Sequence, residues 1–278
     1  MPRIESLNIL TESDGKEYLA ELYGKVIDNV NKQLVSSKMK NTDLSGDPEA
    51  GSVEAKRFVN AKSKKYGTAR TAGKGDAVKA KPVTVAIDQD QEIVEELENK
   101  DIKLYGVDGI LDKRANNHVQ RMVSELDTEF FTEGKNAGTK ITPAATTVED
   151  EIEEAIQTCE NVKNDFVDGV PRSMINLVCS TDYYGKIRNM LDKVSRPNID
   201  STEEEFYAYH GVKTFSSVHL PDGVDYEVMV DGAIAQPVMS DEYTAEKIPL
   251  SNAYGVELFY SYGTKAVMPD LIFYKEGK

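Results

Sequence analysis

Two acidic clusters are the residues of this 278-residue chain that could bind a metal or exchange protons. Five carboxylates crowd residues 149–154, and Asp222 and Asp225 flank a glycine in a Pro-Asp-Gly turn. The first cluster opens a predicted helix, where the helix dipole favours acidic side chains. The second cluster lacks the ligand spacing of an EF-hand, and a tight turn explains it without a metal. We therefore expect no metal-binding residues at either place.

The histidines and cysteines add few further candidates for catalysis or metal binding. His118, His210 and His219 are the three histidines, and the sequence contains no nucleophile elbow, phosphate-binding loop or dinucleotide fingerprint. Cys159 and Cys179 each sit in an apolar pattern, which predicts buried free thiols in a reducing cytosol. We expect no catalytic residues and no cofactor.

Charge is distributed unevenly along the chain. With 33 basic and 48 acidic residues, the net charge is -15, which disfavours a dedicated nucleic-acid binder. Residues 56–81 nevertheless carry nine basic side chains against Asp76 alone. Such a segment would be attracted to the acidic surface of an identical copy. No apolar run is long enough to cross a membrane, and the start of the chain does not resemble an export signal.

Apolar spacing indicates the elements that must carry these residues, in an α+β fold. Helices are predicted over 16–36, 107–134, 147–162 and 180–191, with Asp108 as an N-cap and Gly134 as the C-terminal stop of the second. Residues 88–106 suggest a short acidic helix followed by an extended piece. Residues 174–180 predict a buried strand, 193–205 and 240–255 predict loops, and strands dominate the last 70 residues.

The basic segment lies in a predicted two-stranded excursion over residues 51–88. A solitary ribbon of two strands buries too little apolar surface to be stable in water. It must lie against something else, and another subunit is one such support.

The order of these parts resembles one family. In chain order the parts are an N-terminal arm, a basic excursion, a long helix ending in FFTEGKNAG, the strand and helix of MINLVCSTDYYGKIRNML, the segment AYHGVKTFSSVHLPDG and the ending YGTKAVMPDLIFYK. Together they resemble the major capsid protein of tailed bacteriophages, the Hong Kong 97 fold. The resemblance implies an N-arm at 1–50, an E-loop at 51–88 and a P domain at 89–144 with its spine helix at 107–134. It also implies an A domain over most of 145–235, followed by P-domain return strands and a loop at 236–278.

The resemblance implies a structural protein of the virion, not an enzyme. Identical subunits would form pentamers and hexamers and close into an icosahedral shell around double-stranded phage DNA, assembled in the host bacterial cytoplasm. A separate scaffolding protein and a portal would be partners, and contact with packaged DNA would be weak and non-specific. No membrane partner is expected.

The resemblance also implies three groups of intersubunit contacts. The expected contacts are Lys56, Arg57, Lys62, Lys64, Lys65 and Arg70 in the E-loop, Arg196, Asn198 and Asp200 in an A-loop near the capsomer axis, and Glu246, Lys247 and Asn252 in a P-loop near three-fold axes. The basic excursion would meet the acidic segment 88–98 of a neighbour. Some family members crosslink an E-loop lysine to a neighbour's asparagine, but electrostatics alone explain the lysines here.

Three alternatives remain open from the sequence. An encapsulin-type nanocompartment has the same fold and would enclose cargo enzymes. An acidic cytosolic α+β enzyme would use the carboxylates at 149–154 or 222–225 with a divalent metal. A phage tail or portal component would form rings or tubes.

Overall fold

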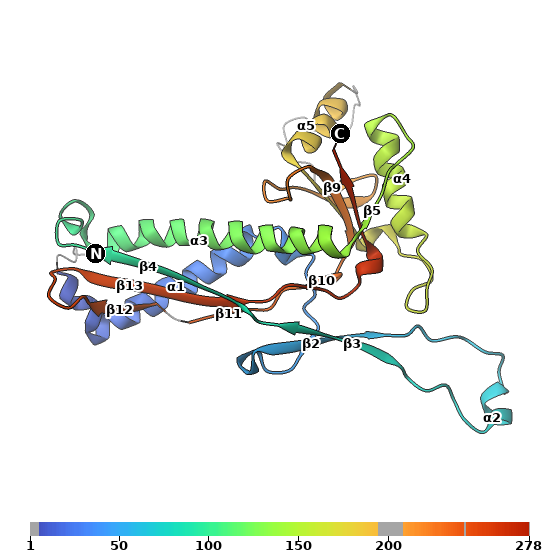
Figure 1. Ribbon diagram of the computed structural model, residues 1–278, viewed down its shortest axis with the longest axis horizontal. Coiled ribbons are helices and arrows are strands. Elements are labelled where there is room, and N and C mark those ends of the chain that lie inside the picture. The colour runs from blue at the N-terminus through green and yellow to red at the C-terminus, as the bar shows by residue number, and fades with distance from the viewer. Residues whose placement is uncertain (1–5, 194–207, 242, 278) are drawn as a thin grey trace. The chain divides into compact units, whose positions relative to one another are not determined.

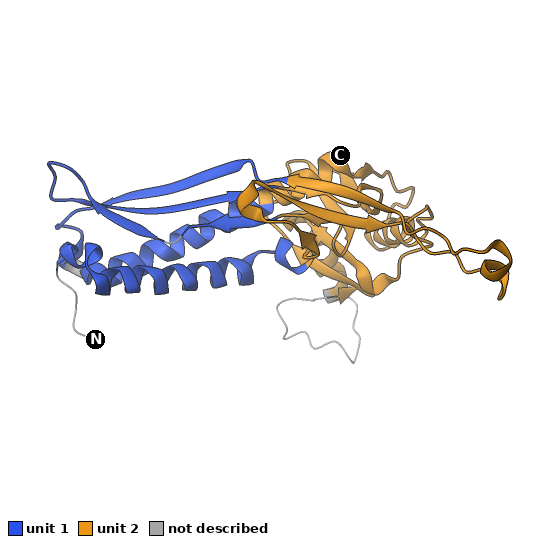
Figure 2. Cartoon of the chain, turned by 90° about the horizontal axis from the view of Figure 1, so that it is seen from below, with its two compact units in different colours: residues 1–38, 86–127, 237–263 blue, residues 39–85, 128–236, 264–278 orange. Residues whose placement is uncertain are grey.

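The computed structural model describes residues 6–193, 208–241 and 243–277 (Figure 1). The chain divides into two compact units, each built from three separate stretches (Figure 2). Unit 1 comprises Met1–Lys38, Ala86–Asp127 and Pro237–Gly263, and unit 2 comprises Met39–Val85, Thr128–Gln236 and Thr264–Lys278.

Unit 1 is a four-stranded antiparallel sheet with helices packed on one face. Its strands are β4 (Gln89–Leu97), β11 (Val238–Ser240), β12 (Thr244–Lys247) and β13 (Tyr254–Tyr262). β13 pairs with β4 along its whole length and with β12 and β11 on its other side. The helices are η1 (Leu7–Thr11), α1 (Ser13–Gln33), η2 (Ser36–Lys38) and the first part of α3 (Ile102–Ala137).

The core of unit 1 follows the predicted apolar stripes. Leu19, Val26 and Val30 of α1 and Leu111, Val119 and Met122 of α3 are buried against the inner face of the sheet, to which Leu97, Val256, Leu258 and Tyr260 belong. Period-two alternation turns the neighbouring residues of each strand to the opposite, outer face.

Three predictions in this unit are wrong. Residues 89–97 form strand β4 and not an acidic helix, because they pair in register with β13 from Tyr254↔Leu97 to Tyr262↔Gln89. The expected loop 240–255 contains strand β12, which also pairs with β13. The third is the piece before Gly106, which was expected to be extended: α3 begins at Ile102, and Gly106, with a positive φ of 77°, separates this first short segment from the helix that was predicted to start at residue 107.

Gly134 does not end α3, which is a fourth correction. The helix continues to Ala137. Gly134 lies against the buried Glu227, and a Cβ at this position would be 2.5 Å from Glu227 Oε2. The glycine is therefore explained by close packing within the helix and not by a left-handed cap.

The largest part of unit 2 is a six-stranded mixed sheet with two helices packed on it. The strand order is β5 (Thr139–Lys140), β15 (Ile272–Glu276), β9 (Val224–Val230), β6 (Ile175–Cys179), β8 (Val212–Ser216) and β7 (Ala208–Tyr209). α4 (Val148–Glu160) and α5 (Thr181–Lys193) pack on it, and η4 (Arg172–Met174) and η5 (Pro269–Leu271) are short connecting helices.

Several predictions for this unit are confirmed. All five residues of β6 are buried, and Thr147 caps α4 by accepting a hydrogen bond from the Asp150 backbone N–H. Cys159 and Cys179 are buried free thiols. Burial raises the pKa of the Cys159 thiol to about 12, so it is not a reactive thiolate at neutral pH.

Two small sheets complete unit 2. β10 (Ile234–Ala235) pairs with β14 (Lys265–Ala266). β1 (Leu44–Ser45), β2 (Ser52–Phe58) and β3 (Ala80–Ala86) form a three-stranded sheet, with η3 (Pro48–Ala50) before β2. A short helix, α2 (Thr68–Ala72), lies between β2 and β3. Among the helices of the described ranges, none is long and apolar enough to span a bilayer.

Candidate intersubunit surfaces

Residues 59–79, called the basic excursion below, leave the three-stranded sheet between β2 and β3 and return to it (Figure 1). Two glycines with positive φ, Gly67 at 91° and Gly73 at 70°, flank the short helix α2 in its middle. The predicted contact residues Lys62, Lys64, Lys65 and Arg70 are all exposed here.

The charged and large apolar side chains of the excursion make few contacts within the described part of the chain. Lys64 pairs with Asp76 at 2.5 Å, and this pair joins two parts of the excursion itself. Tyr66 is 93% exposed and Val78 is 85% exposed. Within the described ranges, no hydrogen bond or ion pair links residues 61–78 to the rest of the chain.

Arg57 and Lys56, the two other residues predicted for the E-loop contact, differ from each other. Lys56 is exposed. The Arg57 side chain is only 10% exposed, and its guanidinium binds Asp270 of η5 within the same unit. The structure thus separates Arg57 from the exposed cations with which the sequence grouped it.

The outer face of the unit 1 sheet is acidic. Its register places Val94 opposite Glu257 and Phe259 opposite Glu92, which puts these four side chains on one face. Val94 is 51% exposed and Phe259 is 36% exposed. We call this surface the acidic sheet face; its members are Asp90, Glu92, Val94 and Glu96 of β4, Glu246 of β12, and Glu257 and Phe259 of β13.

Two of the residues predicted for the P-loop contact belong to strand β12. Glu246 and Lys247 are exposed there, and Asn252 is exposed in the turn between β12 and β13. Leu250 in the same turn is fully exposed and has a positive φ of 60°. The structure therefore brings these predicted residues to one end of one hairpin. Arg196, Asn198 and Asp200, predicted for the A-loop, lie outside the described residues.

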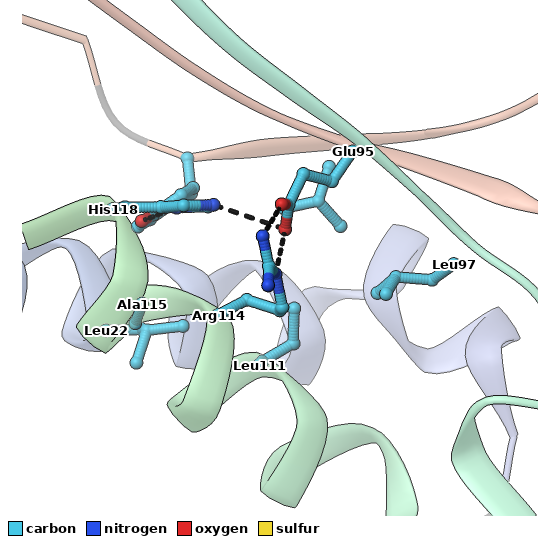
Figure 3. A pocket seen from close by; sticks show the side chains of 9 residues that line it. Leu22, Glu95, Leu97, Leu111, Arg114, Ala115 and His118 are labelled. Atoms are coloured by element: carbon cyan, nitrogen blue, oxygen red, sulfur yellow. Dashed lines mark hydrogen bonds and ion pairs between the residues drawn. The ribbon is translucent and has the colours of Figure 1, made fainter. Parts of the chain in front are cut away.

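A partly buried polar cluster in unit 1 was not anticipated from the sequence (Figure 3). Arg114 of α3 binds the Glu95 carboxylate through two nitrogens, with Nε at 2.7 Å. His118 Nε2 lies 3.2 Å from Glu95 Oε2 without the geometry of a hydrogen bond, and His118 Nδ1 lies 2.6 Å from the Tyr243 hydroxyl. Glu95 points inward from β4, a strand that was predicted as a helix, so no sequence spacing indicated this meeting.

The pKa shifts of its members and the size of the adjoining cavity characterise this cluster. Burial lowers the pKa of His118, although Glu95 opposes the shift. Burial would raise the pKa of Glu95, but the hydrogen bonds from Arg114 and the electrostatic effect of the nearby His118 outweigh it and lower that pKa. The adjoining cavity is about 10 Å³, room for about one water molecule. The cluster joins β4, α3 and the segment before β12. On its outer side Glu95 and Arg114 also line an open hollow of about 390 Å³, together with Asp101 and Ile110.

The acidic cluster 149–154 is occupied by other side chains of unit 2. Glu151 binds Lys275 at 2.8 Å and accepts a hydrogen bond from the Tyr183 hydroxyl. Glu153 binds Arg172, whose hydrogen bond lowers the pKa of that carboxyl to about 2 despite partial burial. Across the described part of the chain, no group of three or more histidine, cysteine or acidic side chains is placed to hold a metal.

Solved structures share this architecture. No protein-family model matches the sequence, and no curated protein matches it. A structure from Mycobacterium phage Che8 is 18% identical, with a TM-score of 0.59, and the match covers 81% of this chain and 84% of that one. The capsid structure of cyanophage P-SCSP1u is 14% identical, with a TM-score of 0.59 and 86% of each chain covered.

A third structure, a virus-like particle from Pyrococcus furiosus, is 14% identical with a TM-score of 0.59, and the match covers 94% of this chain and all of that one. At such low identity the shared property is the fold. This chain has the Hong Kong 97-type capsid fold, which confirms the α+β class and the resemblance found in the sequence.

Proposed function

We propose that this chain is a major capsid protein, whose identical subunits assemble as pentamers and hexamers into an icosahedral shell around double-stranded phage DNA. The observation that carries the proposal is a capsid fold matched over at least four fifths of the chain in phage structures. The role is structural and not enzymatic. The virion is the proposed location, with assembly in the host cytoplasm and a separate scaffolding protein and a portal as partners.

The basic excursion supports assembly from identical copies. It exposes six basic side chains against one acidic side chain, in a protein with a net charge of -15. The acidic sheet face offers five carboxylates around Val94 and Phe259, so it complements both the lysines and the exposed Tyr66 and Val78. We propose that the excursion of one copy lies on this face of a second copy.

The remaining assignments follow the family pattern as proposals. Residues 51–88 would serve as the E-loop, 1–50 as the N-arm, 89–144 as the P domain with the spine helix, 145–235 as most of the A domain, and 236–278 as the return strands and loop. Arg196, Asn198 and Asp200 would meet their counterparts near the capsomer axis. Glu246, Lys247 and Asn252 would do so near three-fold axes. DNA contact would be weak because the chain is acidic.

An encapsulin-type nanocompartment is the second candidate function. The Pyrococcus furiosus structure, matched over all of that chain, is described as a virus-like particle and not as a phage capsid, which keeps a shell with other contents as a candidate. The contents of purified particles separate the two candidates: packaged double-stranded DNA supports the phage shell, and a bound cargo protein supports the compartment.

Charge reversal at the tip of the excursion tests the proposal. We expect the triple variant Lys62→Glu, Lys64→Glu, Lys65→Glu to remain a folded monomer by circular dichroism and size-exclusion chromatography, and to form no shells by negative-stain electron microscopy. The exposed lysines Lys16, Lys32 and Lys265 provide a control triple with the same change in net charge, which should still assemble. Wild-type shell yield from the first triple would contradict the excursion contact.

The wild-type protein itself tests the broader assignment. We expect pentamers, hexamers or closed shells when it is expressed alone or with neighbouring phage genes. Monomers under every condition would contradict a capsid function and would make stoichiometric metal binding the next measurement.

A further inference from the structure

The base of the basic excursion is fastened by one arginine. Arg57 occupies the penultimate position of β2 and donates two hydrogen bonds to Asp270, with Nη2 at 2.9 Å from Oδ2 and Nη1 on Oδ1. The two residues are 213 positions apart in the chain. A guanidinium that binds both oxygens of one carboxylate fixes direction as well as distance.

Asp270 and the guanidinium are themselves held from a second side. Asn164 Nδ2 donates to Asp270 Oδ2 at 2.5 Å, and the Phe166 ring lies with its centroid 4.3 Å from Arg57 Cζ. Asn164 Oδ1 also accepts from the backbone N–H groups of Phe166 and Val167, which orders this turn. The arginine is therefore bound by a carboxylate and stacked on an aromatic ring at the same time.

Backbone hydrogen bonds end at the same place. Val59 N–H donates to the Lys79 carbonyl at 2.9 Å, which joins the first and last residues of the excursion. Asn60 N–H donates to the carbonyl of Asp165 at 2.9 Å. Beyond Asn60, the described residues 61–78 have no hydrogen bond or ion pair to the rest of the chain. The contacts of Arg57 and Asn60 are therefore the last ones between this strand and the rest of unit 2 before the excursion extends into solvent.

The ion pair is maintained at neutral pH. Burial would raise the pKa of Asp270, but the hydrogen bonds and the charge of Arg57 outweigh it and lower that pKa. Asp270 is 33% exposed, whereas the Arg57 side chain is 10% exposed. Lys56, its neighbour of equal charge, is exposed. The basic segment therefore holds two kinds of cation. Arg57 is largely buried in an ion pair with the rest of unit 2, whereas the others are exposed and Lys64 pairs only within the excursion.

We propose that Arg57, Asp270, Asn164 and Phe166 form an intramolecular clamp that sets the direction in which the basic excursion leaves unit 2. Arg57 is then a positioning residue and not a contact to a second copy. Only the last consequence, delivery of the excursion to a neighbour in a preset orientation, rests on the proposed function.

Hydrogen exchange of the full chain, under conditions in which it is unassembled, tests the clamp directly. We expect Arg57→Gln to raise the exchange rates of the Val59 and Asn60 amides by about tenfold or more, with little change in the amides of β6 and β9. Lys56→Gln, which removes the same charge one residue earlier, should leave all these rates unchanged. The double variant Arg57→Asp, Asp270→Arg should restore part of the protection, because it reverses the ion pair.

The outcomes separate the clamp from the proposed function. Wild-type exchange at Val59 and Asn60 in Arg57→Gln would overturn the clamp, whatever the protein assembles into. Faster exchange at every amide would overturn it too, because that result shows a general loss of stability. Faster local exchange together with unimpaired shell formation would uphold the clamp and would show that assembly does not need the preset orientation.

Discussion

Glu227 is fully buried, and burial disfavours the negative charge that a glutamate carries at neutral pH. It lies on β9 with no exposed surface, and neither of its carboxylate oxygens has a hydrogen-bond partner among the described residues. Burial raises its pKa well above the usual value, and Lys135 opposes this only in part. The missing side chain at Gly134 leaves the space that the carboxyl group fills. The fold therefore favours the neutral form of Glu227.

Glutamine at position 227 tests this at different pH values. Because the folded state holds the Glu227 proton more tightly than the unfolded state, the associated stability is present below about pH 4.3 and is lost as the pH rises through the folded pKa. Glu227→Gln cannot ionise, so its melting temperature should rise relative to wild type between about pH 5 and pH 8. Thermal denaturation followed by circular dichroism measures this difference.

The exposed Glu246→Gln on β12 serves as the control for that series. It should follow the wild-type pH dependence. A pH profile of Glu227→Gln that runs parallel to wild type would show that another group titrates.

At the scale of elements, the chain after β13 passes unusually close to the chain before β4. An ideal Cβ on Gly263 would lie 1.7 Å from the Ala86 carbonyl oxygen, inside any allowed contact. Glycine is required there because the backbone of one segment occupies the space of a side chain on the other. This contact fixes where the β4–β13 ladder begins, next to the Tyr262↔Gln89 pair.

Gly263→Ala should therefore destabilise the protein by about 2–4 kcal/mol, because backbone atoms must separate to admit the methyl group. Gly255→Ala on β13 is the matched control, since its Cβ would approach no atom closer than 3.9 Å. Urea unfolding midpoints of both variants measure the effect. Equal midpoints would show that the close approach relaxes without cost.

Elements were predictable where their apolar period is internal to one segment. The spacing of Leu111, Val119 and Met122 indicated α3, and the apolar run of β6 indicated a buried strand. β4 was not predictable in this way, because its acidic composition resembles a helix surface and its identity depends on pairing with β13 more than 150 residues later. Gly134 was mistaken for a stop because only the distant Glu227 explains it.

For the whole molecule, the contrast between basic excursion and acidic remainder predicts a dependence on salt. Assembly should slow as ionic strength rises from about 0.05 M to 0.5 M, because screening shortens the range of attraction between exposed charges. Light scattering during assembly measures the rate, and an unchanged melting temperature shows that the subunits stay folded. Faster assembly at high salt would instead assign the contact to apolar groups such as Tyr66, Val94 and Phe259.

The candidate surfaces were predictable only in part. Two strand-like runs around a lysine-rich segment indicated the excursion, and Lys62, Lys64 and Lys65 are exposed in the structure. The partner of Arg57 was not predictable, because Asp270 lies 213 positions later in the chain and only the fold brings the two residues together. The cluster of His118, Glu95 and Tyr243 was hidden for the same reason.

The distance between Arg57 and Asp270 along the chain also sets an order of events during synthesis. A ribosome completes the excursion some 200 residues before it adds Asp270, and both units receive their last stretch only after residue 236. A nascent chain thus carries its lysine-rich tip unfastened while translation continues. Under the proposed function, copies made side by side on one messenger RNA would carry excursions whose direction the clamp has not yet set. We therefore expect assembly from released, fully folded subunits.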